Sequence, residues 1–173
     1  MKPSNLSIIL IILLVSCSRK SDKELYEEGK AAHAQQDFKL AVERFQEVAD
    51  KSSTTSYAES SLTRIAVIYN NDLHDTRKAI QAYQKIYTLF PESSEAPNAL
   101  FLTGFLYNNE LHNSDSARII YEAFLGRYAN HSLAASAKFE LETLGQDPTQ
   151  LLQSKVSSRQ NDKSQESSGT SKQ

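Results

Sequence analysis

Residues 65–91 read IAVIYNNDLHDTRKAIQAYQKIYTLFP, and residues 103–129 follow the same pattern, 38 positions later, as TGFLYNNELHNSDSARIIYEAFLGRYA. Both copies contain a tyrosine, two asparagines, an acid, a leucine and a histidine in the same order. The shared segment is YNNDLHD at residues 69–75 and YNNELHN at residues 107–113, and it is named here the doubled phrase. A segment that contains both a carboxylate and an imidazole can be a repeated metal or catalytic site, because both groups are good metal ligands. It can also be the turn of a repeating structural unit, and the surrounding spacing decides between the two.

The residues around the doubled phrase favour a structural repeat. An alanine, an aromatic residue and an apolar residue recur with the same 38-residue step in three successive units. These positions are Ala41, Ala79 and Ala117; Phe45, Tyr83 and Tyr121; and Val48, Ile86 and Phe124. Within each unit they are four and three residues apart, which places them on one face of a helix. The sequence therefore predicts an all-α chain with two helices in each repeat.

This pattern resembles the tetratricopeptide repeat over about residues 24–132. In that family a small residue precedes a tyrosine in helix A, an alanine and an aromatic residue follow in helix B, and a proline often closes the unit. The positions that match are Ala66, Gly104, Ala79, Ala117 and Pro91. The unit here is longer than the family's, the first repeat has Gly29 followed by Ala32 in place of the tyrosine, and the third has Ala129 in place of the proline. The resemblance implies an α-solenoid of three helical hairpins.

The expected helix boundaries have their own signals. Ser21 and Glu24 form a capping box at the start of the first helix. Asp37, Asp75, and either Asn113 or Ser114 stand where each helix B should begin, as N-caps. Pro97 falls in the first turn of a helix A, where its missing amide costs little. A last helix, with an apolar stripe of Ala134, Ala137, Leu141 and Leu144, stops at Gly145 and would cap the array, which gives a helical domain over residues 21–146.

The doubled phrase then becomes the turn between helices A and B, with one residue more than the family's shorter unit. Asn70, Asn71, Asn108 and Asn109 suit a helix end, because asparagine tolerates the left-handed conformation. Leu73 and Leu111 would fold the turn back onto its own hairpin. Two helix layers, each roughly 8–10 Å thick, separate His74 from His112, so the two cannot share a metal ion. His33 and His131 are interpreted as surface residues, and no cofactor is expected.

Composition narrows the function further. The chain has 19 basic and 21 acidic residues, and therefore offers no basic field for nucleic acid. It contains no phosphate-binding glycine loop, paired zinc motif or nucleophile elbow. Stacked helical repeats form binding grooves far more often than active sites, so the sequence favours a binding protein over an enzyme.

The N-terminal end resembles a bacterial lipoprotein signal. An apolar run from Ile8 to Val15 is too short to span a membrane, which needs about 20 residues, and fits the central region of a signal peptide. The run ends in LVSC, which resembles the lipobox, so residues 1–16 would be removed and Cys17 lipidated, with residues 17–20 as a short linker. Ser18 after the cysteine implies the outer membrane, facing the periplasm. The alternatives are a plain secretory signal or a buried apolar end, with Cys17 as an ordinary thiol.

The C-terminal end, residues 147–173, is rich in Ser, Gln and Lys and has almost no large apolar residue after Val156. Such a segment cannot bury enough surface to offset the entropy of ordering it, so it is expected to be disordered.

A partner site is expected on the A helices, which line the concave face in the family. The exposed positions in the second repeat would be Thr63, Val67, Asn70 and Asn71, and in the third Phe101, Phe105, Asn108 and Asn109. The third helix A, ALFLTGFLY, is apolar nearly all round, so Phe101 and Phe105 need a cover. That cover is either a partner segment in the groove, or the array's own curvature or its tail through Leu151 and Leu152. A carboxylate clamp of lysines and arginines is not expected here, because apolar residues occupy its positions.

Together these features predict a lipid-anchored periplasmic scaffold for envelope proteins. The chain resembles the lipoprotein subunit of the outer-membrane β-barrel assembly machinery, which implies a role in outer-membrane protein assembly. The alternative resemblance is to the Tol-Pal associated tetratricopeptide protein, which implies envelope or cell-division coordination.

Overall fold

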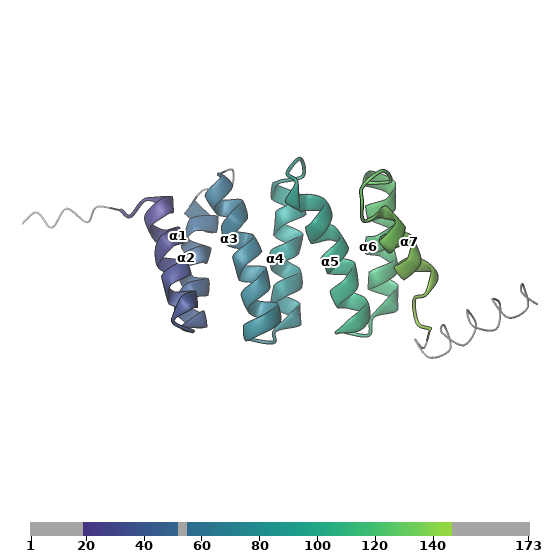
Figure 1. Cartoon of the computed structure of the whole chain (residues 1–173), viewed down its shortest axis with the longest axis horizontal. Helices are drawn as coiled ribbons and strands as arrows, with labels where there is room; N and C mark the ends of the chain where they lie inside the picture. Colours follow the sequence, from purple (N-terminus) through teal and green to yellow (C-terminus); the bar gives the residue numbers. More distant parts are fainter. Residues whose placement is uncertain (1–18, 52–54, 147–173) are drawn as a thin grey trace, which may run out of the picture.

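The computed structural model describes residues 19–51 and 55–146, and every regular element in these two ranges is helical. The helices run in a row along the long axis of the molecule (Figure 1). Their bounds are α1 Asp22–Ala34, α2 Phe38–Lys51, α3 Ser56–Val67, α4 Thr76–Leu89, α5 Glu95–Asn109, α6 Ser114–Arg127 and α7 Ala134–Glu142, with a π-helical turn η1, Ile68–Asp72, that continues α3. The predicted all-α architecture of three hairpins, α1–α2, α3–α4 and α5–α6, followed by a last helix is confirmed.

The alanine, aromatic and apolar residues that recur every 38 positions form the buried centre of each hairpin. Ala41, Ala79 and Ala117 are fully buried, and the apolar residues one and two turns further along each B helix are also buried, with Tyr83 the most exposed of them at 8%. The glycines of the first and third A helices lie directly against the aromatic rings of the B helices. A Cβ atom added at Gly29 would lie 2.8 Å from the ring of Phe45, and one at Gly104 would lie 2.8 Å from the ring of Tyr121. The absence of a side chain at Gly29 and Gly104 therefore sets how closely the two helices of a hairpin approach each other, as the resemblance implies.

The helix caps follow the sequence. Ser21 and Glu24 form the expected capping box at the start of α1. Asp75 accepts a hydrogen bond from the amide of Lys78, and Asn113, rather than Ser114, caps α6 by accepting from the amide of Ser116. At the start of α2 the carboxylate of Asp37 accepts from the amide of Leu40. Each of these side chains satisfies an amide that the first helical turn leaves unpaired.

The doubled phrase is a turn, as predicted, but its asparagines are not the left-handed residues. Asn70 and Asn71 lie in η1, and Asn108 and Asn109 are the last residues of α5. His74 and His112 have positive φ angles of 51° and 50°. The expectation for the asparagines is therefore wrong, because the helix continues past them before the chain reverses.

The extra residue of the longer unit explains this displacement. In the first hairpin the amide of Asp37 donates to the carbonyl of Ala32, five residues back, across Gln36 with a φ of 61°. In the second hairpin the equivalent bond, from Asp75 to Tyr69, spans six residues. The third hairpin repeats this wider closure from Asn113 to Tyr107. The additional residue is thus absorbed at the end of helix A, and the left-handed position moves on to the histidine.

The last helix, α7, caps the array against α6. Ala137 is buried with Tyr121 and Phe124, and the predicted stripe of Ala134, Leu141 and Leu144 packs against the same cluster. Gly145 follows the helix with a φ of 74°, a conformation that glycine adopts without strain.

Several sequence-based expectations lie outside the described residues. These are the signal peptide 1–16, the lipidation of Cys17 and the tail 147–173. Within residues 19–51 and 55–146, no helix combines the length and apolar character needed to cross a bilayer.

Candidate functional site: a groove on the A helices

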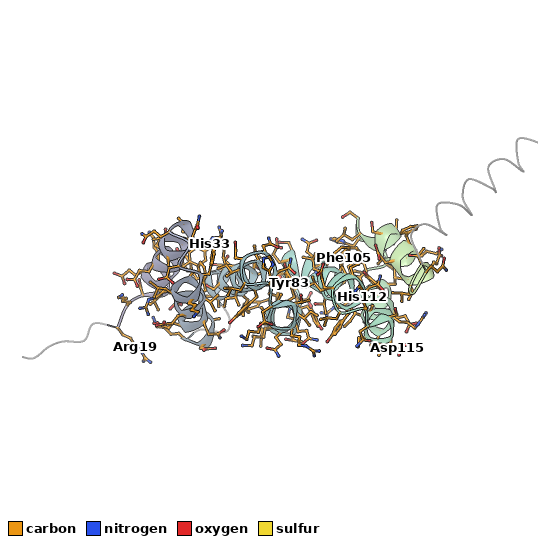
Figure 2. The ribbon with its side chains drawn as sticks, turned by 90° about the horizontal axis from the view of Figure 1, so that it is seen from below. Arg19, His33, Tyr83, Phe105, His112 and Asp115 are labelled. Carbon is orange, nitrogen blue, oxygen red and sulfur yellow. The ribbon has the colours of Figure 1, made fainter. Side chains whose placement is uncertain are left out.

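The odd-numbered helices form one layer of the molecule and the even-numbered helices the other (Figure 2). His33 of α1 and Phe105 of α5 lie on one side in this view, and Asp115 of α6 lies on the opposite side. The layer of odd-numbered helices is the one on which the sequence predicts a partner site. The predicted residues on it do not come together in a single site.

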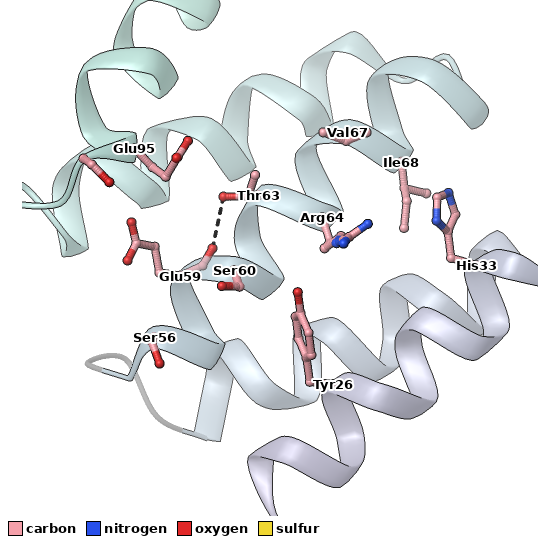
Figure 3. A pocket seen from close by; sticks show the side chains of 11 residues that line it. Tyr26, His33, Ser56, Glu59, Ser60, Thr63, Arg64, Val67, Ile68 and Glu95 are labelled. Atoms are coloured by element: carbon pink, nitrogen blue, oxygen red, sulfur yellow. Dashed lines mark hydrogen bonds between the residues drawn. The ribbon is translucent and has the colours of Figure 1, made fainter.

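A groove of about 430 Å³ opens on this layer, between α1 and α3 and toward the start of α5. It is named here the α1–α3 groove. Figure 3 shows it from close by, with side chains that converge from three helices. Its lining residues are Tyr26, His33, Ser56, Glu59, Ser60, Thr63, Arg64, Val67, Ile68, Ser94 and Glu95. Of the predicted binding residues, Thr63 and Val67 line this groove.

The charged residues of the groove follow a definite order along α3. Glu59 belongs to the first turn of α3, and Glu95 is the first residue of α5. Figure 3 places these two carboxylates at the same end of the groove, with Arg64 further along α3. Among the described residues, none of these three side chains takes part in a salt bridge. Their charges therefore remain available to a bound segment.

The opposite end of the groove is closed by a contact between repeats. Nε2 of His33, on α1, lies 3.2 Å from Oδ2 of Asp72, in η1, and both side chains are largely covered. The expectation that His33 is a plain surface residue is therefore wrong. This contact ties the end of one helix A to the end of the next, and so holds the walls of the groove in register.

The floor of the groove is positioned by aromatic packing. The ring of Tyr26 lies 5.4 Å from that of Phe45 and 5.5 Å from that of Tyr57, both in tilted arrangements. Its hydroxyl end points into the groove in Figure 3. The hydroxyl of Thr63 donates to the carbonyl of Glu59 at 3.2 Å, so the methyl side of Thr63 is left for contact.

Phe101 is half-buried, and its own hairpin supplies part of its cover. Its ring lies 5.7 Å from the ring of Tyr121 and 6.0 Å from that of Phe124, both on α6, and its role in binding stays a prediction. Phe105 does remain 38% exposed on the odd-numbered layer, as predicted. It lies apart from the α1–α3 groove, which it does not line.

The four predicted asparagines also fall outside the groove lining. Nδ2 of Asn70 donates to Oδ1 of Asn71 at 2.7 Å, and Nδ2 of Asn109 donates to the carbonyl of Phe105 at 3.1 Å. Asn108 is half-buried at the end of α5. These side chains chiefly serve the helix ends, and their role in binding stays a prediction.

The sequence analysis missed the charged lining residues Glu59, Arg64 and Glu95, and it also missed two residues of the first repeat. Tyr26 and His33 lie 37 positions before Thr63 and Asn70, so they occupy the equivalent places on α1. A 38-residue step does not align these two residues with Thr63 and Asn70, because the turn of the first hairpin lacks the extra residue that the turns of the second and third hairpins contain. Aligning the repeats separately on Gly29 and Ala66 would have found both.

The chemistry of the groove is that of recognition. It offers two carboxylates, a guanidinium, hydroxyl groups and short apolar surfaces. Among residues 19–51 and 55–146, no group of three side chains comes together with the residue types and geometry of a metal site.

Comparisons with known proteins support the repeat assignment. Residues 60–93 match the family model of the tetratricopeptide repeat. Among solved structures, the chain is similar to a tetratricopeptide repeat protein from Parabacteroides merdae ATCC 43184, with 19% identity and a TM-score of 0.35. That match covers 70% of this chain and 59% of the other, so the chain spans less than two thirds of that protein's length. No curated protein matches the chain. The family-model match supports the resemblance over residues 60–93, and repeats of this kind serve as protein-interaction scaffolds.

Proposed function

We propose that this chain is a lipid-anchored periplasmic scaffold, not an enzyme, that holds a segment of another cell-envelope protein in the α1–α3 groove. In this proposal the lipid on Cys17 tethers the chain to the outer membrane, and the partner belongs to outer-membrane protein assembly. The groove is the working part, and the hairpins behind it supply a rigid support.

The observation that carries the binding role is the α1–α3 groove itself. Its volume of about 430 Å³ equals that of a small-molecule pocket, for which roughly 300–1,000 Å³ is typical, so it has room for a few residues of a bound segment. Two adjacent repeats form its walls, and the contact between His33 and Asp72 fixes them relative to each other. Glu59, Arg64 and Glu95 have no partners in salt bridges among the described residues, and a bound segment would supply them.

The anchoring role is supported by the LVSC motif at residues 14–17 and by how the domain begins. Nζ of Lys51 donates to the carbonyl of Lys20 at 2.7 Å, and Ser21 caps α1, so the folded domain starts four residues after Cys17. A cysteine with two or more acyl chains is held stably at a bilayer, whereas one chain holds only marginally. The domain would therefore stay close to the membrane surface.

The binding role is tested by photocrosslinking in intact envelopes. A photoreactive amino acid at Thr63 lies in the groove, whereas the same residue at Asp115 lies on the opposite layer and serves as the control. We expect crosslinks to one envelope protein from Thr63 and not from Asp115. A component of the barrel-assembly machinery would support the stated role, and a Tol-Pal component would support the coordination role instead. Equal crosslinking from both positions would refute a dedicated groove.

The anchor is tested by Cys17→Ser. Mass spectrometry of the wild-type chain should show an acylated Cys17 as the first residue, and the variant should leave the membrane fraction or retain residues 1–16. An unmodified thiol at Cys17, together with an unchanged distribution of the variant between fractions, would refute lipidation.

A further inference from the structure

The order of charges in the α1–α3 groove carries a further inference, which rests on the proposed function. Glu59 and Glu95 lie at one end of the groove and come from two different helices, and Arg64 follows along α3 (Figure 3). The groove therefore presents negative charge and then positive charge in one direction. A partner that matches this order must carry a basic group and an acidic group at a fixed separation.

The helix geometry sets that separation. Glu59 and Arg64 are five residues apart on α3, and a helix rises about 1.5 Å per residue, so their Cα atoms are displaced by about 7.5 Å along the axis. An extended chain advances about 3.3 Å per residue. Two to three residues of an extended segment thus span the distance between the two charges.

The same geometry favours an extended segment over a helix. α1 and α3 contact each other only in part, and the groove beside that contact has a volume of about 430 Å³. A single turn of a helix with its side chains is a cylinder about 10–12 Å wide and 5.4 Å long, roughly 500 Å³, which exceeds the volume of the groove. A few residues of an extended chain follow the groove at about 3.3 Å per residue and need less room.

We infer that the groove selects an extended partner segment with a Lys or Arg two to three positions away from an Asp or Glu. Glu59 and Glu95 bind the basic side chain, and Arg64 binds the acidic one, in the forked geometry that suits a carboxylate. Side chains between the two charges contact Tyr26 and Val67. This selectivity involves the A helices of the first two repeats and the start of α5 in the third.

The test is selection of displayed random peptides on the full chain, purified from envelopes in detergent. Sequencing the selected pool should show the paired charges enriched about two- to fivefold for each pair, the effect expected of partly exposed ion pairs. Arg64→Ala should remove the preference for the acidic residue alone. Glu59→Gln with Glu95→Gln should remove the preference for the basic residue alone. Arg118→Ala and Glu122→Gln on the exposed face of α6 are the matched controls and should change neither preference.

Thermal unfolding of each variant shows that it is folded, which matters because Glu59 and Glu95 also lie in first turns, where acids favour the helix. Selected peptides without paired charges, or a preference that survives Arg64→Ala in a folded variant, would overturn the inference. A failure to select any peptide would overturn it as well. In each of these cases, crosslinking from Thr63 to an envelope protein would leave the proposed function standing.

Discussion

The spacing within each hairpin depends on single residues whose side chains are small or absent. Gly104 is surrounded by the helix and by the buried ring of Tyr121, which has no room to move outward. Gly126, on α6, has no neighbouring atom within 4 Å of the place where a Cβ would be. The two glycines therefore offer opposite tests of the same substitution.

Gly104→Ala should destabilise the protein by about 1–3 kcal/mol, because the new methyl group overlaps a packed ring and forces the hairpin apart. Gly126→Ala should instead stabilise it by up to about 1 kcal/mol, because alanine is the better helix former and meets no obstacle. Urea unfolding monitored by circular dichroism gives both values. A stabilising Gly104→Ala would show that the close approach of α5 and α6 is not real.

A second residue-scale feature is Glu140 on α7. Partial burial raises the pKa of its carboxyl, and the nearby hydroxyl of Tyr121 is buried with no hydrogen-bond partner among residues 19–51 and 55–146. Burial, followed by the charge of Glu140, raises the pKa of Tyr121 well above its usual value. The folded state therefore disfavours ionised Glu140, so its contribution to stability is present at a pH below its ordinary pKa of 4.5 and is lost as the pH rises through the raised value.

Glu140→Gln removes this ionisation. We expect the variant to have a higher Tm than the wild type at pH 7, and the difference to shrink as the pH falls toward 4.5. Differential scanning calorimetry between pH 4.5 and 8 measures it. A variant whose Tm lies below that of the wild type at pH 7 would show that ionised Glu140 makes a favourable contact.

At the scale of the element, the starts of α4 and α6 are equivalent caps with different charge. Asp75 caps α4 and also contacts Nζ of Lys78 at 3.0 Å, whereas the neutral Asn113 caps α6. A hydrogen bond from the Lys78 side chain, followed by one from its amide, lowers the pKa of Asp75. Its stabilising effect is therefore present above the ordinary value of 3.8 and is lost as the pH falls through the lowered pKa.

Asp75→Ala should lower the urea midpoint at pH 7 and have progressively less effect below pH 3.8. Asn113→Ala should cost about 1 kcal/mol at every pH, as is usual for a neutral cap. Urea unfolding from pH 3 to 7 compares the two. The same pH dependence for both variants would contradict the role given to the Asp75 carboxylate.

The elements also show how far the sequence could predict the fold. The 38-residue step of alanines and rings placed every hairpin, because burial of those positions is set by helix periodicity alone. The left-handed residue was misplaced, because an asparagine favours that conformation locally while the six-residue closure from Asp75 to Tyr69 carries the helix past it. Propensity at one position cannot show how an inserted residue is absorbed.

At the scale of the whole molecule, the candidate site was predicted only in part. Val67 lies in the groove, but Phe101 does not line it and is partly covered by α6, and a helical pattern does not show how far a neighbouring ring reaches. Tyr26 and His33 were missed, because their repeat is one residue shorter. The predicted layer of A helices was informative, whereas the choice of repeats that form the groove depends on packing between repeats.

The account depends on the α1–α3 groove being the binding surface. The most direct measurement is the affinity of the partner captured from Thr63 for a Thr63→Trp chain, in which the indole fills the groove. We predict at least a tenfold weaker Kd by isothermal titration calorimetry, equivalent to about 1.4 kcal/mol, with an unchanged Tm and an unaffected Asp115→Trp control. A Thr63→Trp chain that binds its partner as tightly as the wild type would contradict the account.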